Sequence, residues 1–211
     1  MTDAGIGVDH VVFGAFHLED GIHAVERQTG VRAALGGRHP GWGTANALAS
    51  LGDGCYLEII APDPSQPAPP RPRHFGLDTL DTPGLVAWAA RTRDIDAVSA
   101  RARAGDVPLG DIRDGSRERL DGVRLAWRLT EPRVDITGCV IPFLIDWGRS
   151  PHPSADAPGG MTLVELRAEH PDPGAMSRML ESIGAALPVD RGERAALVAV
   201  VDTPRGRVVL R

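Results

Sequence analysis

Two residues suited to acid–base or metal chemistry lie in apolar, strand-like segments, His10 within 8–13 and Glu58 within 56–60. Side chains alternate between the two faces of a strand, so His10 shares a face with the valines two positions away. An imidazole and a carboxylate are ligands that divalent metal ions accept, and Glu58 can also move a proton. The two groups converge if both faces belong to one concave surface. The alternatives are a core histidine held by Asp9 and an edge-strand glutamate that faces water.

The glycine-rich segment 36–46 supplies a second set of polar and aromatic side chains. Backbone freedom at glycine lets His39 enter a pocket, where it would serve as a third metal ligand or as a general base. Trp42 would form an aromatic wall for a planar or apolar ligand. Thr44 and Asn46 alternate onto one face and would hydrogen-bond a polar ligand. The competing interpretations are a solvated histidine, a tryptophan that fastens the loop to the sheet, and an ordinary turn-to-strand junction.

Composition limits the function classes that these residues can serve. The 211 residues are 42% hydrophobic and 24% charged, which excludes disordered, collagen-like and membrane-embedded chains. All 23 basic residues are Arg, which excludes lysine Schiff-base chemistry, and charges of both signs are interspersed at a net charge of −5. A chain without a basic patch is not expected to bind nucleic acid or an anionic membrane. We therefore expect a small-molecule ligand as the partner.

The sequence also predicts a cellular compartment. No apolar stretch approaches the ~20 residues that span a bilayer, and residues 1–7 lack the basic and apolar regions of a secretory leader. Cys55 and Cys139 lie in apolar, strand-like runs, which is typical of buried thiols in a reducing environment. We expect a cytoplasmic protein.

The elements that must position the candidate side chains recur in one order along the chain. The first unit is predicted as strand, helix, strand and strand over 8–13, 18–30, 44–51 and 55–61, with a further strand near 31–35. A proline-rich connector follows at 62–83, where no periodic pattern survives the spacing of the prolines. The same order returns over 85–92, 95–104, 123–129 and 139–147. After a second proline-rich stretch at 150–160 it returns again over 162–168, 173–183, 196–201 and 207–210. This repetition predicts a modular α+β protein.

Several of these segments together form a recognisable pattern. They are Val8-Asp9-His10-Val11-Val12, Gly36 to Asn46, Tyr56-Leu57-Glu58-Ile59-Ile60, Ile141 to Gly148 and His170 to Pro173. Over about residues 8–210 the chain resembles the glyoxalase-like domain family of the vicinal oxygen chelate superfamily. The resemblance implies repeated βαβββ modules that form a curved half-barrel with the site on its concave face. We expect one domain over 8–148, made of paired modules at 8–62 and 83–148, with a third, shorter βαββ unit at 161–211 packed on it.

The resemblance also implies a divalent metal, Zn, Ni, Mn or Fe, held by His and Glu side chains from the first and last strands of the modules. His10 and Glu58 match this pattern, with His39 as a third ligand. Glu58 or His39 would then move a proton in a metal-dependent lyase, isomerase or dioxygenase that acts on a small, oxygen-rich substrate. The second module departs from the pattern, because Trp88 stands where a histidine is expected.

This departure favours an alternative, a metal-free binding protein of the resistance type in which Trp42 and Trp88 stack on a ligand. A third interpretation is a degenerate structural domain, in which His10 and Glu58 would be separated or buried without partners. Whether the chain forms a homodimer is left open.

Overall fold

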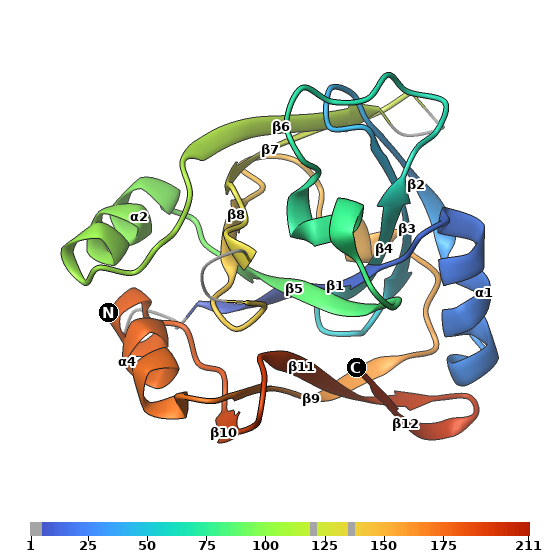
Figure 1. Ribbon diagram of the computed structural model, residues 1–211. Helices are drawn as coiled ribbons and strands as arrows, with labels where there is room; N and C mark the ends of the chain where they lie inside the picture. The colour runs from blue at the N-terminus through green and yellow to red at the C-terminus, as the bar shows by residue number, and fades with distance from the viewer. Residues whose placement is uncertain (1–5, 119–121, 135–137) are drawn as a thin grey trace.

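An eight-stranded sheet organises the computed structural model, which describes residues 6–118, 122–134 and 138–211 (Figure 1). In hydrogen-bonded order its strands are β2 (Ala34–His39), β3 (Thr44–Ser50), β4 (Tyr56–Pro62), β1 (Gly7–Gly14), β5 (Gly84–Arg91), β8 (Phe143–Asp146), β7 (Arg124–Thr130) and β6 (Ile112–Glu118). The strands curve into a ring, and the α-helices lie outside this ring.

Two units of one topology build this sheet. In the first unit, β1 is followed by helix α1 (Leu18–Thr29) and the antiparallel strands β2, β3 and β4, and β1 pairs in parallel with β4. The second unit repeats this order with β5, helix α2 (Ile95–Ala104) and β6 to β8, and β5 pairs in parallel with β8. The units meet where β1 and β5 pair antiparallel, with His10 opposite Ala89. The predicted α+β class and its βαβββ modules are confirmed.

The two edge strands of the sheet approach each other and nearly close the barrel. β2 and β6 lie in contact, and Arg117 on β6 donates a hydrogen bond from Nη1 to the carbonyl oxygen of Gly36 on β2. A side chain thereby satisfies a backbone acceptor on an edge strand, where no ladder partner is available. The sides of the barrel therefore enclose its interior.

Local sequence signals set the bounds of the helices. Asp94 and Asp172 each accept a hydrogen bond from a backbone N–H of the helix that follows, α2 and α4 (Pro173–Ile183) respectively. Helix α1 ends at Gly30, whose φ of 78° lies in the left-handed region that glycine adopts without a Cβ clash. The helices predicted at 95–104 and 173–183 are confirmed.

Both faces of the central strands are buried, which divides the apolar core in two. On β1, Val11 packs in the core shared with the helices, while Val12 packs inside the barrel, and both are fully buried. Strand alternation explains this division. His10 and Glu58 lie on the inward faces of β1 and β4, so their side chains line the interior of the barrel.

A second sheet lies outside the barrel, below it in the view of Figure 1. Its strands are, in order, β10 (Val189–Arg191), β9 (Thr162–His170), β11 (Ala196–Thr203) and β12 (Gly206–Leu210). β10 pairs in parallel with β9. The sequence prediction of a βαββ unit omits this three-residue strand, so the unit has one strand more than predicted. The hairpin of β11 and β12 is confirmed. The bounds of the three predicted units stay a prediction.

Three strands of the barrel differ from the sequence predictions. β6 is missing from them because its sequence IRDGSRE is polar, and its strand conformation depends on pairing with β7. β2 lies at 34–39 instead of near 31–35. β8 occupies only 143–146 of the strand predicted at 139–147, since Pro142 has no N–H to donate to a ladder.

The proline-rich connector between the two units crosses one end of the barrel. It contains the 3₁₀ helix η1 (His74–Thr79), which Figure 1 shows in the middle of the ring. Asp63 N and Arg73 Nε both donate to the carbonyl oxygen of Gly43, each over 2.9 Å, and so tie the connector to the turn between β2 and β3. Phe75 of η1 is buried in the interior core. The connector therefore forms part of the barrel core.

Within the described residues, no helix combines the length and apolar character needed to cross a membrane. Residues 1–5, which bear on the expectation that the chain lacks a leader, lie outside the described part.

Candidate active site

The interior of the barrel contains a small cavity of about 40 Å³. Polar side chains gather on part of its wall, and aromatic and aliphatic side chains complete it. The lining residues are His10, His39, Trp42, Asn46, Leu48, Tyr56, Glu58, Ile60, Phe75, Arg117, Trp127, Leu129, Phe143, Ile145 and Trp147. We call this set the cup. An apolar concavity with a few converging polar groups is typical of small-molecule sites.

The structure brings the imidazole of His10 and the carboxylate of Glu58 together at the wall of the cup. His10 Nε2 lies 3.5 Å from Glu58 Oε2, because the parallel pairing of β1 with β4 sets Glu58 beside Val12, two residues from His10. The His10 ring stacks on Tyr56, with ring centres 4.5 Å apart and an interplanar angle of 18°. Burial raises the pKa of the Tyr56 phenol well above its usual value, so its hydroxyl stays protonated. Both candidate residues therefore have defined partners.

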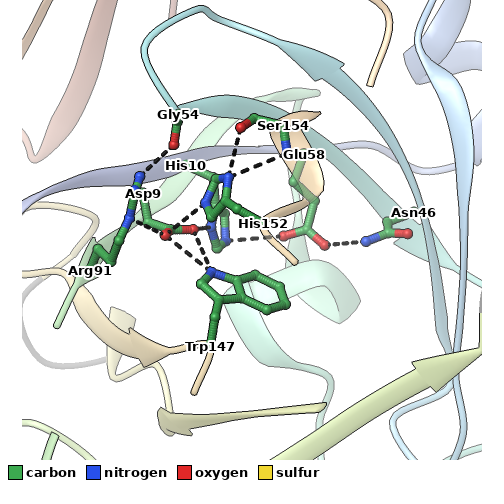
Figure 2. A network of polar contacts seen from close by, with 9 residues as sticks. All are labelled: Asp9, His10, Asn46, Gly54, Glu58, Arg91, Trp147, His152 and Ser154. Carbon is green, nitrogen blue, oxygen red and sulfur yellow. Dashed lines mark hydrogen bonds and ion pairs between the residues drawn. The ribbon is translucent and has the colours of Figure 1, made fainter. Parts of the chain in front are cut away.

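A fully buried carboxylate, Asp9, holds the far side of the His10 ring (Figure 2). It accepts hydrogen bonds from His10 Nδ1 over 2.8 Å, Arg91 Nε over 2.9 Å, His152 Nε2 over 3.0 Å and Trp147 Nε1 over 3.1 Å. Burial alone would raise the pKa of Asp9, but the hydrogen bonds from His10 and His152 outweigh burial and hold the pKa far below its usual value. Asp9 is therefore an anion shared by four segments of the chain.

The charge of Asp9 determines the tautomer of His10. An ionised carboxylate only accepts hydrogen bonds, so the proton of neutral His10 is on Nδ1, and Nε2 is left to face Glu58. The same argument places a proton on His152 Nε2, whose other ring nitrogen accepts from the backbone N–H of Ser154 in the 3₁₀ helix η2 (Pro153–Ala155). His10 Nε2 therefore has no proton to donate to Glu58, and it can accept a hydrogen bond from Glu58 when that carboxyl group takes up a proton.

Asn46 holds the second oxygen of Glu58. Asn46 Nδ2 donates to Glu58 Oε1 over 2.6 Å, and the amide packs against the backbone of Gly36, where the Cβ of any other residue would lie only 2.3 Å from Asn46 Oδ1. Only glycine leaves room for the amide in this position. One carboxylate oxygen is therefore fixed and the other faces His10.

The remaining residues predicted from the segment 36–46 take different places. His39 lines the cup, and its Nδ1 lies 2.9 Å from Thr44 Oγ1. Burial lowers the pKa of His39, although the charge of Glu58 acts in the opposite direction, so the ring is neutral at pH 7. Trp42 also lines the cup, whereas Thr44 supports His39 from behind and is not part of the lining.

The predicted stacking role of Trp88 is wrong. Trp88 is fully buried in the outer core, on the face of β5 opposite the cup, and its Nε1 donates to the carbonyl oxygen of Val140 over 2.9 Å. The residues that β5 turns inward are Ala87 and Ala89. Strand alternation explains the difference, since adjacent positions face opposite ways.

Among its described residues, the second unit contributes one cation and no carboxylate or imidazole to the cup. Arg117 is 7% exposed and lines the cup from β6. The inward residues of β8 are Phe143 and Ile145. The charged groups of the lining are therefore Glu58 and Arg117, beside the titratable rings of the two histidines.

The donor set does not fit a resident metal ion. Ligand atoms 3.5 Å apart, as in His10 and Glu58, match a tetrahedral ion with bonds of about 2.0–2.2 Å, but catalytic zinc sites use three protein ligands. Within the described ranges, no group of three or more His, Cys, Asp or Glu side chains is placed to hold a metal ion. His39 in particular does not complete a set with His10 and Glu58.

Sequence reasoning missed several residues of the site, namely Asp9 as an anion with four donors, Arg117, Phe75, Trp147 and His152. The one available signal was Asp9 beside His10, which indicates a hydrogen bond but not the other donors. His152 lies 143 positions from Asp9 in the chain. No local pattern can report such a contact.

Comparisons with known proteins place this geometry in a wider context. The family model described as the glyoxalase-like domain matches residues 8–184. Among solved structures, a hypothetical protein from Staphylococcus aureus has a TM-score of 0.68 at 13% identity, covering 89% of this chain and 87% of that chain. No curated protein matches the chain.

Two methylmalonyl-CoA epimerase structures have lower TM-scores. One, in complex with methylmalonyl-CoA and NH4+, is 19% identical with a TM-score of 0.49 and covers 71% of this chain and all of that chain. The other, from Mycobacterium tuberculosis, is 21% identical with a TM-score of 0.43 and covers 74% and 95% of the two chains. At 13% identity, the structure of the Staphylococcus aureus protein bears on the fold alone.

Proposed function

The chain belongs to the glyoxalase-like domain family, and from this premise we propose that it is an enzyme that moves a proton on the carbon next to a carbonyl group. The substrate is a small carbonyl compound bound in the cup. Glu58 is the base, Nε2 of His10 accepts a hydrogen bond from Glu58 once Glu58 carries the proton, and Arg117 binds the carbonyl oxygen. The observation that carries the proposal is the carboxylate of Glu58 in the cup, held on Oε1 by Asn46 over 2.6 Å and with Oε2 3.5 Å from His10 Nε2.

The proposed reaction needs only groups of this chain. Glu58 removes the proton from carbon, and the electron pair moves to the carbonyl oxygen, which becomes an enolate. The Arg117 guanidinium stabilises this oxyanion in a site with little water, where charge interactions are strong. Return of the proton from Glu58 to the same carbon completes an exchange. In a substrate with a hydroxyl group on the neighbouring carbon, delivery of the proton to the former carbonyl carbon, with transfer of the hydroxyl proton to the enolate oxygen, completes an isomerisation. Charge is balanced throughout, since Glu58 becomes neutral as the enolate forms beside Arg117.

Asp9 and Asn46 support this reaction without touching the substrate. Asp9 holds His10 in the tautomer that leaves Nε2 facing Glu58. Asn46 fixes one carboxylate oxygen, so the free lone pairs of Glu58 keep one direction. Groups whose orientation is set in advance need no reorganisation during proton transfer.

The donor set favours proton transfer over dioxygen activation and over metal-dependent lyase chemistry. Two protein ligands, His10 and Glu58, are fewer than the three of a catalytic zinc site or of a facial triad for iron. Elemental analysis of untagged protein, beside the variant Glu58→Ala, tests this directly. We expect substoichiometric metal in both proteins. Stoichiometric transition metal that disappears in Glu58→Ala would support the metal-dependent alternative instead.

The experiment that tests the function follows deuterium incorporation. The protein is incubated in D2O with acetone, hydroxyacetone or pyruvate, and loss of the proton signal next to the carbonyl is followed by NMR. We expect exchange that Glu58→Gln lowers by ~100-fold or more, the usual contribution of a general base. The matched control Glu165→Gln changes an exposed carboxylate on the second sheet and should leave exchange unchanged. Equal exchange in wild type and Glu58→Gln would overturn the proposal.

A binding protein without catalysis is the second candidate, and the aromatic wall of the cup favours it. Phe75, Trp127, Phe143 and Trp147 line one cavity and offer contact area to an apolar ligand. Saturable ligand binding to the cup without any Glu58-dependent exchange would select this candidate.

A further inference from the structure

We propose that Phe75 determines the size of ligand that the cup accepts and restricts it to carbonyl compounds of two or three carbons. This inference rests on the proposed function, because it names the substrate class of the same site. It is carried by the position of one side chain that belongs to neither unit of the barrel.

The Phe75 ring occupies space in the cup that a ligand would otherwise fill. Phe75 is 7% exposed, lines the cavity that contains Glu58, and lies with its ring centre 5.6 Å from that of Phe143. The cavity that remains is about 40 Å³. Since a water molecule needs roughly 10–15 Å³ by this measure, the remaining space holds about three or four waters. That corresponds to a ligand of about three or four heavy atoms, the largest of which is represented by acetone.

The ring comes from the connector and not from a barrel strand. Phe75 belongs to η1, the segment that lies in the middle of the ring of strands in Figure 1. Arg73 and Asp78 bracket it, because the backbone N–H of Arg73 donates to Asp78 Oδ2 over 2.7 Å and the two side chains form an ion pair. Arg73 also donates from Nε to Gly43. The segment that carries the ring is thus fastened on both sides of Phe75 by contacts outside the cup.

The backbone at Phe75 has a conformation that bulky residues seldom adopt. Its φ and ψ are 63° and 15°, in the left-handed region, and Gly76 follows with φ 67°. Among the described residues, the other non-glycine positions with positive φ are Asp53 and Asp106, a residue type that tolerates this region better. A strained residue persists where its surroundings fix it, and such residues gather at ligand sites. The strain therefore points to a requirement for an aromatic ring in the cup.

Space for a larger ligand exists on the other side of the neighbouring aromatic residues. A second cavity, of about 540 Å³, is lined by Trp42 and His74, whose rings meet at 4.8 Å. Trp42 lines the cup as well. The size limit is therefore imposed at the cup by Phe75 and not by the surroundings of the barrel.

The test compares ligand size in the full-length wild type and in Phe75→Ala. Acetone and acetophenone are titrated separately, and binding is followed by NMR of the indole N–H groups. Trp127 and Trp147 line the cup and report binding, whereas Trp88 lies outside it and serves as an internal control. Phe13→Ala is the matched variant, because Phe13 is 4% exposed but packs in the outer core.

We expect wild type to bind acetone and to bind acetophenone at least tenfold more weakly than Phe75→Ala does. Phe13→Ala should keep the wild-type preference. Phe75→Leu, which retains an apolar side chain, gives an intermediate result and serves if Phe75→Ala does not fold. Acetophenone binding of equal strength in wild type and Phe75→Ala overturns the inference. If wild type shows the expected size preference but catalyses no deuterium exchange, the result contradicts the proposed function and leaves the inference about Phe75 standing.

Discussion

Asn46 donates from Nδ2 to Glu58 Oε1 over 2.6 Å, so the carboxylate of the candidate base is held on one oxygen and free on the other. This contact crosses from β3 to β4 inside the barrel. The contact between the two strands therefore fixes the orientation of the Glu58 carboxylate before any ligand binds.

Replacement of Asn46 by Leu should destabilise the protein and disturb Glu58. The substitution removes a hydrogen bond to a charged, buried group, which contributes about 1.5–3 kcal/mol. Urea unfolding followed by tryptophan fluorescence measures the change. Thr203→Val, which removes an exposed side-chain hydrogen bond in the β11–β12 turn, should cost less than half as much. Equal losses in both variants would contradict the role assigned to Asn46.

Asp9→Asn should lower the free energy of unfolding at pH 7 by on the order of 3 kcal/mol, because it leaves the Arg91 guanidinium and two imidazoles without their anion. The pKa of Asp9 is lower in the folded protein than its usual value of 3.8. A lowered folded pKa gives stability that is present above the unfolded pKa and is lost as pH falls towards the folded pKa.

The difference between wild type and Asp9→Asn should therefore be constant from pH 7 to about pH 5 and shrink below pH 4. Chemical unfolding at a series of pH values measures it. Other aspartates with lowered pKa values, such as Asp63 and Asp78, affect both proteins alike and cancel in the difference. A difference that grows on acidification would show that Asp9 is not the stabilising anion.

Trp88→Phe should leave ligand binding by the cup unchanged and reduce stability. The variant loses the hydrogen bond from Nε1 to Val140, worth about 1 kcal/mol, and part of the buried ring. Acetone titration followed through Trp127 and Trp147 checks the first expectation, and thermal unfolding checks the second. A weakened affinity for acetone would place Trp88 at the ligand, against its position in the outer core.

Both thiols should resist modification in the native protein. Burial raises the pKa of Cys55 to about 12 and that of Cys139 to about 11, so both are protonated at pH 8, and the thiolate is the reactive form. Reaction with a disulfide reagent at pH 8 should be slow until a denaturant is added, after which two thiols react. Prompt reaction of either thiol without denaturant would show that it is accessible.

The sequence predicts those parts of the molecule whose causes are local. Helix α2 follows from an aspartate cap and apolar spacing within one short window. The inward direction of His10 and Glu58 follows from alternation in strongly apolar strands. β6 does not follow, because a polar segment becomes a strand only through its partner β7.

The site is harder to predict, because its contacts join distant segments. Asp9 meets His152 and Trp147 only after the barrel has closed. The error at Trp88 has another cause, since the family pattern gives a position on β5 but not which face that position occupies. Arg117 is one of 23 arginines in the sequence, and only the fold buries it.

The two units of the barrel meet where β1 and β5 pair antiparallel, and they contribute different kinds of side chain to the cup. The first unit contributes His10 and Glu58, to which we assign the proposed proton transfer, whereas the second contributes Arg117 and mostly carbon surface, including Ala89 opposite His10. Substitutions in the second unit can therefore reshape the ligand's surroundings while the acid–base pair stays intact. The duplication of one module thus separates the proposed base from most of the carbon surface around the ligand, so that selection for a new substrate can act on that surface of the second unit while Glu58 and Arg117 are kept.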